Sequence, residues 1–175
     1  MSAHRIGLIG CGGIASAWIR AVAEHDDCEF DWVFDLDADA AARRAEETSA
    51  TVATDLASGL ASADIDMVVI GTPTSSHPGL VAQAAAAGKH VMCEKPMALG
   101  LDDCQAMIDA CATAGVQLAI GHSLRFWGAF LKSRRLIADG AIGTPVSGSI
   151  DRLGSAKARQ EDTAAATPDH WRNDP

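Results

Sequence analysis

A glycine-rich segment near the N-terminus, residues 10–15 (GCGGIA), has the residue types and spacing of a phosphate-binding turn. In a G-x-G-x-x-A turn between a strand and a helix, Gly10 permits a tight bend, Gly12 lets a pyrophosphate approach the backbone, and Ala15 keeps the helix near the strand. The N–H groups and partial positive charge of the helix N-terminus would hold the phosphates. A purely structural turn is the alternative, but the expected strand–turn–helix context favours dinucleotide binding.

A carboxylate lies where a dinucleotide-binding domain would meet the ribose of adenosine. Asp35 ends the second apolar run, 23 residues after the second glycine of the turn. It could accept hydrogen bonds from ribose hydroxyls and would repel a 2′-phosphate, which favours NAD over NADP. The alternative role for Asp35 is a helix N-cap, although Asp37 or Asp39 could serve as the cap. Arg43 and Arg44 lie too far into the next helix to argue strongly for NADP.

A third polar segment, residues 71–78 (GTPTSSHP), follows the apolar run at residues 67–70. Ligands of open α/β sheets bind beyond the carboxyl ends of the strands, which is where this segment would lie. Ser75, Ser76 or His77 could instead cap the helix that follows. The sequence leaves both contact with the cofactor and helix capping open.

A lysine follows the fifth expected strand, in residues 93–96 (CEKP). Beside a cofactor cleft, Lys95 could orient a substrate hydroxyl or donate a proton. From the pattern alone the alternative is a solvated lysine on a surface loop.

Short apolar runs alternate with amphipathic helical patterns along residues 1–123, and these elements would position the polar segments. The runs are continuously apolar, as expected when helices cover both faces of a parallel sheet. The strand–helix order predicts an α/β fold with a doubly wound parallel sheet, the Rossmann fold, with right-handed crossovers. The predicted strands are Ile6–Ile9, Phe30–Phe34, Met67–Ile70, His90–Met92, Val116–Ile120 and, more weakly, Thr51–Ala53.

The pattern changes near residue 123. Apolar residues at helical spacing predict one more helix around residues 127–137, and partial alternation over Pro145–Leu153 predicts a strand. The polar residues after it show no periodicity. We therefore expect a dinucleotide-binding Rossmann domain over residues 1–123. Residues 124–175 would form the truncated, incomplete start of a C-terminal α+β domain for substrate binding and oligomerisation.

The charge of the chain is unevenly distributed and bears on its partners. The net charge is −9; residues 1–123 carry six basic and 17 acidic side chains, a net −11, and residues 124–175 carry eight basic and six acidic ones, a net +2. A domain of charge −11 is not expected to bind nucleic acid through a general basic field. A phosphate ligand would have to be held locally, by backbone amides at a helix N-terminus.

Apolar segments and cysteines indicate the compartment. No apolar run approaches the ~18 residues of a membrane span, and the N-terminal run is too short for a signal peptide. The cysteines lie in apolar segments without a C-x-x-C pair or the ligand spacing of a metal site. We expect reduced core cysteines in a cytoplasmic protein that binds neither a metal nor a membrane. They are Cys11, Cys28, Cys93, Cys104 and Cys111.

Together these motifs resemble the glucose–fructose oxidoreductase/inositol dehydrogenase (Gfo/Idh/MocA) family over essentially the whole chain. The central match combines a TP-x-x-x-H start, an AGKHV strand entry and an EKP triplet, and is highly specific. The matching segments are residues 7–15, 72–99, 135–147 and 170–175. The resemblance implies that Lys95 is the active-site lysine that contacts the reacting hydroxyl. It implies a cofactor site lined by Gly10, Gly12, Gly13, Ile14, Asp35, Thr72, Pro73, His77 and Glu94, next to Lys95, with His122 and Arg125 in a loop facing the nicotinamide.

The resemblance implies NAD(H)-dependent hydride transfer at a carbinol carbon of a sugar, cyclitol or polyol, in a protein whose second domain forms a homo-oligomer interface. The sequence departs from the family after its Trp171-Arg172 element, because the glycine-rich stretch and the Asp-x-x-x-His acid/base motif do not follow. We therefore expect these 175 residues to be a fragment that is inactive alone. The alternatives are a non-catalytic NAD-binding module or sensor and a methyltransferase. The EKP triplet and the Thr72-Pro73 loop argue against the methyltransferase.

Overall fold

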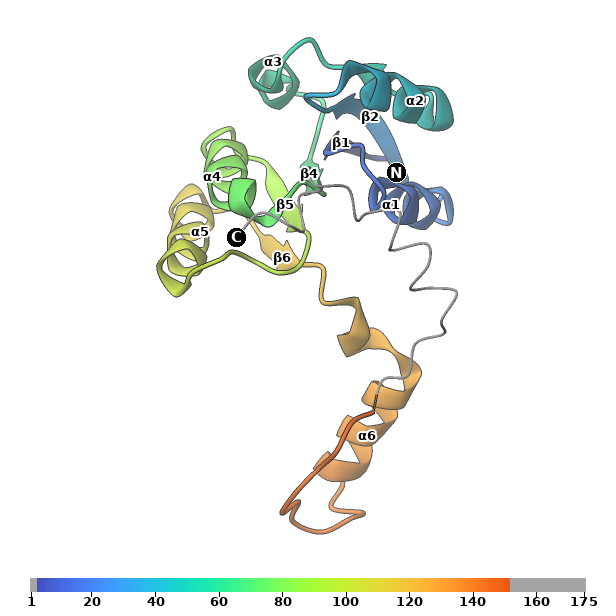
Figure 1. Cartoon of the computed structure of the whole chain (residues 1–175), viewed down its shortest axis with the longest axis vertical. Helices are drawn as coiled ribbons and strands as arrows, with labels where there is room; N and C mark the ends of the chain where they lie inside the picture. The colour runs from blue at the N-terminus through green and yellow to red at the C-terminus, as the bar shows by residue number, and fades with distance from the viewer. Residues whose placement is uncertain (1–2, 152–175) are drawn as a thin grey trace, which may run out of the picture. The chain divides into compact units, whose positions relative to one another are not determined.

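The structure is a computed structural model that describes residues 3–151, and its N-terminal unit contains a sheet of six parallel strands (Figure 1). The strands lie in the order β3-β2-β1-β4-β5-β6, so the chain starts in the middle, winds out to β3, returns at β4 and winds out to β6. This is the order of a doubly wound dinucleotide-binding sheet, and it confirms the predicted Rossmann fold. The strands are β1 (His4–Ile9), β2 (Cys28–Phe34), β3 (Thr51–Val52), β4 (Met67–Ile70), β5 (His90–Cys93) and β6 (Leu118–Ile120).

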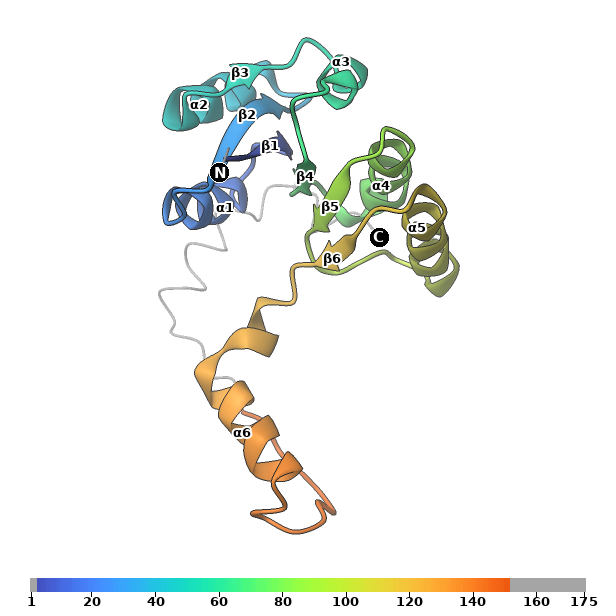
Figure 2. The ribbon, with the colours of Figure 1, turned by 180° about the vertical axis from the view of Figure 1, so that it is seen from behind.

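Helices cover both faces of the sheet, and α4 and α5 lie side by side on one of them (Figures 1 and 2). On the face of α1 and α2, the strand residues Leu8 and Val33 pack with the small Ala15. On the face of α3, α4 and α5, Val68 packs in a cluster with Met107. These buried apolar layers explain why the strands are apolar on both faces. The helices are α1 (Ala15–Ala23), α2 (Ala38–Thr48), α3 (Leu56–Ala61), α4 (His77–Ala86) and α5 (Leu101–Ala114).

All six predicted strands are present, and pairing explains where their ends differ from the prediction. β2 begins two residues earlier than predicted, because Cys28 already pairs with His4 of β1. β6 begins two residues later, at Leu118, since the amide of Val116 still donates to a carbonyl of α5, at 3.0 Å. Periodicity thus located the elements, and backbone partners set their ends.

Trp32 of β2 is buried between two glycines on the α3 side of the sheet. It is 3% exposed, and its ring fills the space beside Gly7 of β1 and Gly59 of α3. A Cβ on Gly59 would lie 3.0 Å from the ring, and one on Gly7 would overlap it. Packing therefore leaves no room for a methyl group at Gly7 and little room at Gly59, because the interior is close-packed.

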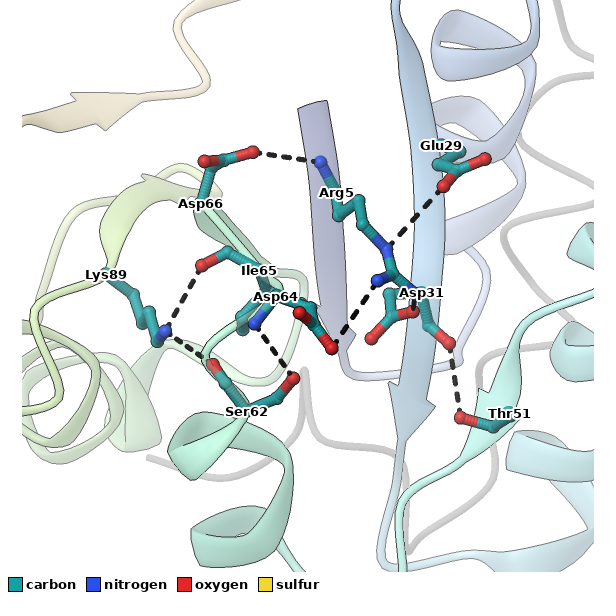
Figure 3. Close-up of polar contacts among 9 residues, drawn as sticks. All are labelled: Arg5, Glu29, Asp31, Thr51, Ser62, Asp64, Ile65, Asp66 and Lys89. Carbon is teal, nitrogen blue, oxygen red and sulfur yellow. Dashed lines mark hydrogen bonds and ion pairs between the residues drawn. The ribbon is translucent and has the colours of Figure 1, made fainter. Parts of the chain in front are cut away.

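The amino ends of the strands carry a polar cluster around Arg5 (Figure 3). Its guanidinium pairs with Asp31 and lies 3.6 Å from carboxylate oxygens of Glu29 and Asp64. Its backbone amide donates to Asp66 at 3.1 Å. The cluster links the starts of β1 and β2 to the loop before β4, at the sheet edge opposite the carboxyl ends.

Lys89 holds the same loop from the other side (Figure 3). The side chain is buried, and Nζ donates to the carbonyl oxygens of Ser62 at 2.6 Å and Ile65 at 3.1 Å. Hydrogen bonds to two backbone carbonyls compensate for removing the ammonium from water. Lys89, just before β5, therefore fixes the connection between α3 and β4.

A second compact unit, Ser123–Pro175, follows the first, Met1–His122. Its described residues form a 3-10 helix, η2 (Ser123–Phe126), and α6 (Gly128–Ala138). The helix predicted around residues 127–137 is therefore present. The interpretation of this unit as the start of a substrate domain stays a prediction.

The strand predicted over Pro145–Leu153 is wrong for the residues that the structure describes. Residues 145–151 form no strand, and Val146 and Ile150 are 97% and 77% exposed. A strand needs a neighbour that pairs with its backbone, and the described residues offer none to this segment. The rest of the predicted strand and the Trp171-Arg172 element lie outside the described residues.

Several properties predicted from composition can be compared with the structure. All five cysteines are unpaired thiols. Within residues 3–151, no group of three or more His, Cys, Asp or Glu side chains could hold a metal ion. No helix in this same range is long and apolar enough to cross a membrane.

Candidate functional site

The loops that carry the predicted site residues begin together at the carboxyl edge of the sheet. Beyond four strands, the next residue extends the ladder by one backbone hydrogen bond, which fixes where each loop starts. In a doubly wound sheet this edge is where ligands bind, next to the crossover between β1 and β4. The four bonds run from Gly10 N to Phe34 O (2.9 Å), Gly71 N to Ile9 O (2.8 Å), Glu94 N to Ile70 O (2.9 Å) and Gly121 N to Cys93 O (2.8 Å).

The glycine-rich turn joins β1 to α1. Gly10 has a φ of +95°, and a Cβ there would lie 2.7 Å from the carbonyl carbon of Gly71, so the position requires glycine. At Gly12 and Gly13, by contrast, a Cβ would meet no atom of the chain within 4 Å. No side chain caps the first turn of α1, which begins at Ala15. The open space and the uncapped helix N-terminus fit a pyrophosphate lying on the backbone.

Asp35 follows β2 and is anchored to the glycine-rich turn. Oδ2 accepts a hydrogen bond from the amide of Cys11 at 2.6 Å, and Oδ1 accepts one from Asp37 N at 2.9 Å. The cap of α2 is Asp37, whose Oδ1 accepts from the amides of Asp39 and Ala40. The capping alternative for Asp35 is therefore wrong. Its partly exposed carboxylate keeps acceptor capacity for ribose hydroxyls beside the turn.

Arg44 of α2 reaches back to the same turn, a contact that sequence reasoning missed. Nε donates to Cys11 O at 3.2 Å, and Nη2 donates to Gly12 O at 3.1 Å. Nη1 donates to both carboxylate oxygens of Glu47, at 2.9 and 2.7 Å. The sequence signal was the i, i+3 spacing of Arg44 and Glu47, which predicts their pairing but not the reach to the turn.

Two buried thiols lie at this edge, at the turn and at the end of β5. Burial raises the pKa of the Cys11 thiol to about 11; Asp35 contributes to the rise and Arg44 opposes it. Burial raises the pKa of the Cys93 thiol to about 12, with a further contribution from Glu94. Both thiols are therefore protonated and unreactive near neutral pH.

Hydrogen bonds of hydroxyl groups stabilise the loop after β4. The hydroxyls of Thr72 and Ser76 lie 2.7 Å apart, and Ser76 Oγ donates to Pro73 O at 2.7 Å. No side chain caps α4, so the helix-capping alternative for this loop is wrong. The loop approaches the turn closely, since a Cβ on Gly71 would lie 2.9 Å from Ile14 Cγ2. Ile14, a residue of the turn that is 38% exposed, thus lies against this loop.

His77 is buried behind this loop, 1% exposed. Nε2 lies 3.0 Å from Thr72 O, and Nδ1 lies 3.1 Å from Pro96 O and 3.2 Å from Met97 O. Both ring nitrogens thus face backbone carbonyls of this chain. His77 ties the loop after β4 to the loop after β5, which is the loop that carries Lys95.

Glu94 is buried after β5 and connects three elements. Oε1 accepts from the indole Nε1 of Trp18 in α1 at 3.0 Å, and Oε2 accepts from Lys95 N at 3.1 Å. A Cβ on Gly121, after β6, would lie 3.3 Å from Oε1. The side chain of Lys95 is exposed, and among residues 3–151 its ammonium makes no hydrogen bond or ion pair. Lys95 therefore has a fixed backbone and a side chain available to a ligand.

The two remaining predicted residues fall on either side of the division between the units. His122, the last residue of the first unit, is exposed, and its amide donates to Ile120 O at 2.6 Å. Arg125 is exposed in η2 of the second unit. The loops at the carboxyl edge of the sheet therefore carry the predicted residues of the first unit, and Arg125 belongs to the second unit.

Comparison with known proteins agrees with this geometry. The model of the GFO_IDH_MocA family, described as "Oxidoreductase family, NAD-binding Rossmann fold", matches residues 4–122. D-apiose dehydrogenase of Paraburkholderia graminis is 38% identical over 146 residues, covering 82% of this chain and 38% of the relative. Inositol 2-dehydrogenase of Rhizobium meliloti is 36% identical over 139 residues, covering 79% of this chain and 42% of the relative.

A solved structure gives the same result in three dimensions. The WlbA dehydrogenase of Bordetella pertussis, crystallised with NADH and UDP-GlcNAcA, superposes with a TM-score of 0.78 at 34% identity. The similarity covers 81% of this chain and 41% of that one. Matches to the curated relatives likewise span only 36% to 44% of the relatives' length.

Proposed function

The chain belongs to the Gfo/Idh/MocA family of NAD-binding Rossmann-fold oxidoreductases, and we propose that its protein transfers hydride between NAD(H) and a sugar, cyclitol or similar polyol. The observation that carries this proposal is the glycine-rich turn, with open space over Gly12 and Gly13 and an anchored carboxylate, Asp35, beside it. The sugar and cyclitol dehydrogenases among the relatives support the substrate class.

The residues of the turn bind the dinucleotide, with the pyrophosphate on the backbone at Gly12 and on the N-terminus of α1. Asp35 accepts hydrogen bonds from the ribose hydroxyls and disfavours a 2′-phosphate, so NAD is preferred to NADP. Ile14, Thr72 and Pro73 flank the bound cofactor. His77 and Glu94 serve this site by holding its loops, as their contacts with backbone groups support.

Lys95 is the proposed catalytic residue. The nicotinamide, when bound, supplies the hydride acceptor or donor. The exposed ammonium of Lys95 donates a hydrogen bond to the substrate oxygen and stabilises the charge that develops there. His122 and Arg125 would face the nicotinamide in the complete protein, and the second domain would complete the pocket and mediate homo-oligomerisation.

A non-catalytic NAD-binding module or sensor is the second candidate, favoured by the open glycine-rich turn and the anchored Asp35, which bind a dinucleotide without needing a catalytic residue. Both candidates bind NAD and differ in turnover. Turnover on a polyol panel by a protein that includes the second domain, measured with and without Lys95→Ala, distinguishes them. Turnover by the unchanged protein that falls by ~10²–10⁴-fold in Lys95→Ala supports the catalytic role. No turnover of any polyol by the unchanged protein supports the sensor.

Calorimetric titration of the 175-residue chain with NAD⁺ and NADP⁺ tests the cofactor proposal. NAD⁺ is expected to bind more tightly. Asp35→Ser should shift the ratio of dissociation constants toward NADP⁺ by roughly tenfold, since the repulsion of the 2′-phosphate is removed. Asp39→Ser, which removes an exposed carboxylate in the first turn of α2, is the matched control. Equal or tighter binding of NADP⁺ by the unchanged chain would contradict the role of Asp35.

A further inference from the structure

Asp35 and Arg44 both form hydrogen bonds with the backbone of Cys11 in the glycine-rich turn, Asp35 with its amide and Arg44 with its carbonyl. The Asp35 carboxylate accepts from Cys11 N at 2.6 Å, and the Arg44 guanidinium donates to Cys11 O at 3.2 Å. Burial raises the pKa of the Cys11 thiol, and of the two charges Asp35 adds to the rise while Arg44 opposes it. A cation therefore lies close to the carboxylate that is proposed to meet the ribose.

A guanidinium in this neighbourhood is the group that usually accommodates the 2′-phosphate of NADP. In this chain all three nitrogens of Arg44 are already engaged, two by turn carbonyls and the third by Glu47. The Arg44 side chain is 16% exposed and that of Glu47 is 47% exposed. Glu47 thus compensates the positive charge of Arg44 on its solvent-facing side, while carbonyls of the turn accept hydrogen bonds from its other two nitrogens.

We propose that Glu47 is a specificity-determining residue: by pairing with Arg44, it keeps this guanidinium on the glycine-rich turn and withholds it from a 2′-phosphate. This inference rests on the proposed binding of a dinucleotide at the turn. Discrimination against NADP then has two parts, which are the negative charge of Asp35 and the sequestered positive charge of Arg44. Removing Glu47 leaves Arg44 uncompensated and free to turn one N–H group toward a phosphate.

The test is calorimetric titration of the 175-residue chain with NAD⁺ and NADP⁺ at low ionic strength, where charges are least screened. Glu47→Gln should lower the ratio of the NADP⁺ to the NAD⁺ dissociation constant by roughly fivefold or more. Glu46→Gln removes the same charge one position earlier on the exposed surface of α2, and should leave the ratio unchanged. Adding Arg44→Met to Glu47→Gln should abolish the gain.

The outcomes separate this inference from the proposed function. If the unchanged chain binds neither dinucleotide, both fail. If it prefers NAD⁺ but Glu47→Gln leaves the ratio unchanged, or Glu46→Gln changes it equally, only the role of Glu47 fails. Circular dichroism melts verify that each variant is folded, and Glu47→Ala provides a second variant that should change the ratio in the same direction.

Discussion

His77 shows how single buried polar groups shape the candidate site. Its two ring nitrogens face the carbonyls of Thr72, Pro96 and Met97, which belong to the loops after β4 and β5. The TP-x-x-x-H pattern located this residue, and the family resemblance implied a place beside the cofactor. The structure supports a positioning role, because both ring nitrogens lie within hydrogen-bond distance of backbone carbonyls of its own chain.

His77→Ala is expected to lower the free energy of unfolding by about 1–3 kcal/mol, since it removes a buried side chain and the hydrogen bond that its imidazole donates to a loop carbonyl. Thermal denaturation followed by circular dichroism measures the change. His25→Ala, at an exposed position in the loop before β2, is the control and should melt like the unchanged chain. Identical melting temperatures for both variants would mean that His77 does not hold these loops.

Burial of the Cys93 thiol is expected to lower the stability of the first unit at alkaline pH. The thiol has its ordinary pKa of 9.0 when unfolded and a pKa raised by burial to about 12 when folded. Between pH 9 and pH 11 the unfolded chain loses this proton while the folded chain keeps it, so stability falls as pH rises. We expect a loss of roughly 2–3 kcal/mol from this residue by pH 11.

Urea denaturation at pH 8 and pH 11 checks this expectation. Cys93→Ala should lose less stability between the two pH values than the unchanged chain does. Cys104→Ala, at a partly exposed position on α5, should lose as much as the unchanged chain. Equal losses in the two variants would rule out Cys93 as the cause.

Helices and strands of the first unit were predictable because their apolar residues repeat with the period of each element. The tight turn at Gly10 was also predictable, and the N-cap of α2 was narrowed to Asp37 or Asp39, since both features depend on local backbone geometry. The reach of Arg44 to the turn was not readable, because it depends on how α2 packs against the turn. The predicted strand at Pro145–Leu153 failed for the same reason, as a strand depends on a partner that alternation does not identify.

The glycines of β1 and its turn are expected to behave differently when replaced by alanine. Gly7→Ala forces a methyl group into the buried Trp32 ring and should cost about 1–3 kcal/mol of stability. Gly12→Ala meets no atom of the chain, so stability should change by less than about 1 kcal/mol. The methyl group would occupy the space proposed for the pyrophosphate, so NAD⁺ affinity should fall at least tenfold, equivalent to about 1.4 kcal/mol. Melting curves and calorimetry on both variants measure the two effects, and an unchanged affinity in Gly12→Ala would contradict the assigned pyrophosphate position.

At the scale of the whole molecule, the two units differ in how many of their apolar side chains are buried. Among residues 3–151, the apolar clusters that form the core lie between Ile6 and Ile120. In the second unit, no described side chain is fully buried, and apolar residues such as Phe126 and Ile142 are 73% and 60% exposed. Cofactor binding is therefore expected of the first unit, which has its own core.

We expect the 175-residue chain to bind NAD⁺ without sustained oxidation of any polyol. In the proposed mechanism Lys95 would supply one polar contact to a substrate oxygen, and these 175 residues contain no Asp-x-x-x-His motif to exchange its proton. Positioning of the substrate against the nicotinamide contributes ~7–11 kcal/mol to such reactions, and one exposed lysine does not provide it. The measurement is steady-state NADH absorbance with a panel of sugars and cyclitols, with a complete inositol 2-dehydrogenase as the positive control. NADH production above the no-protein baseline, by protein of verified mass and lost in Lys95→Ala, would mean that the first unit forms a competent active site without the acid/base motif.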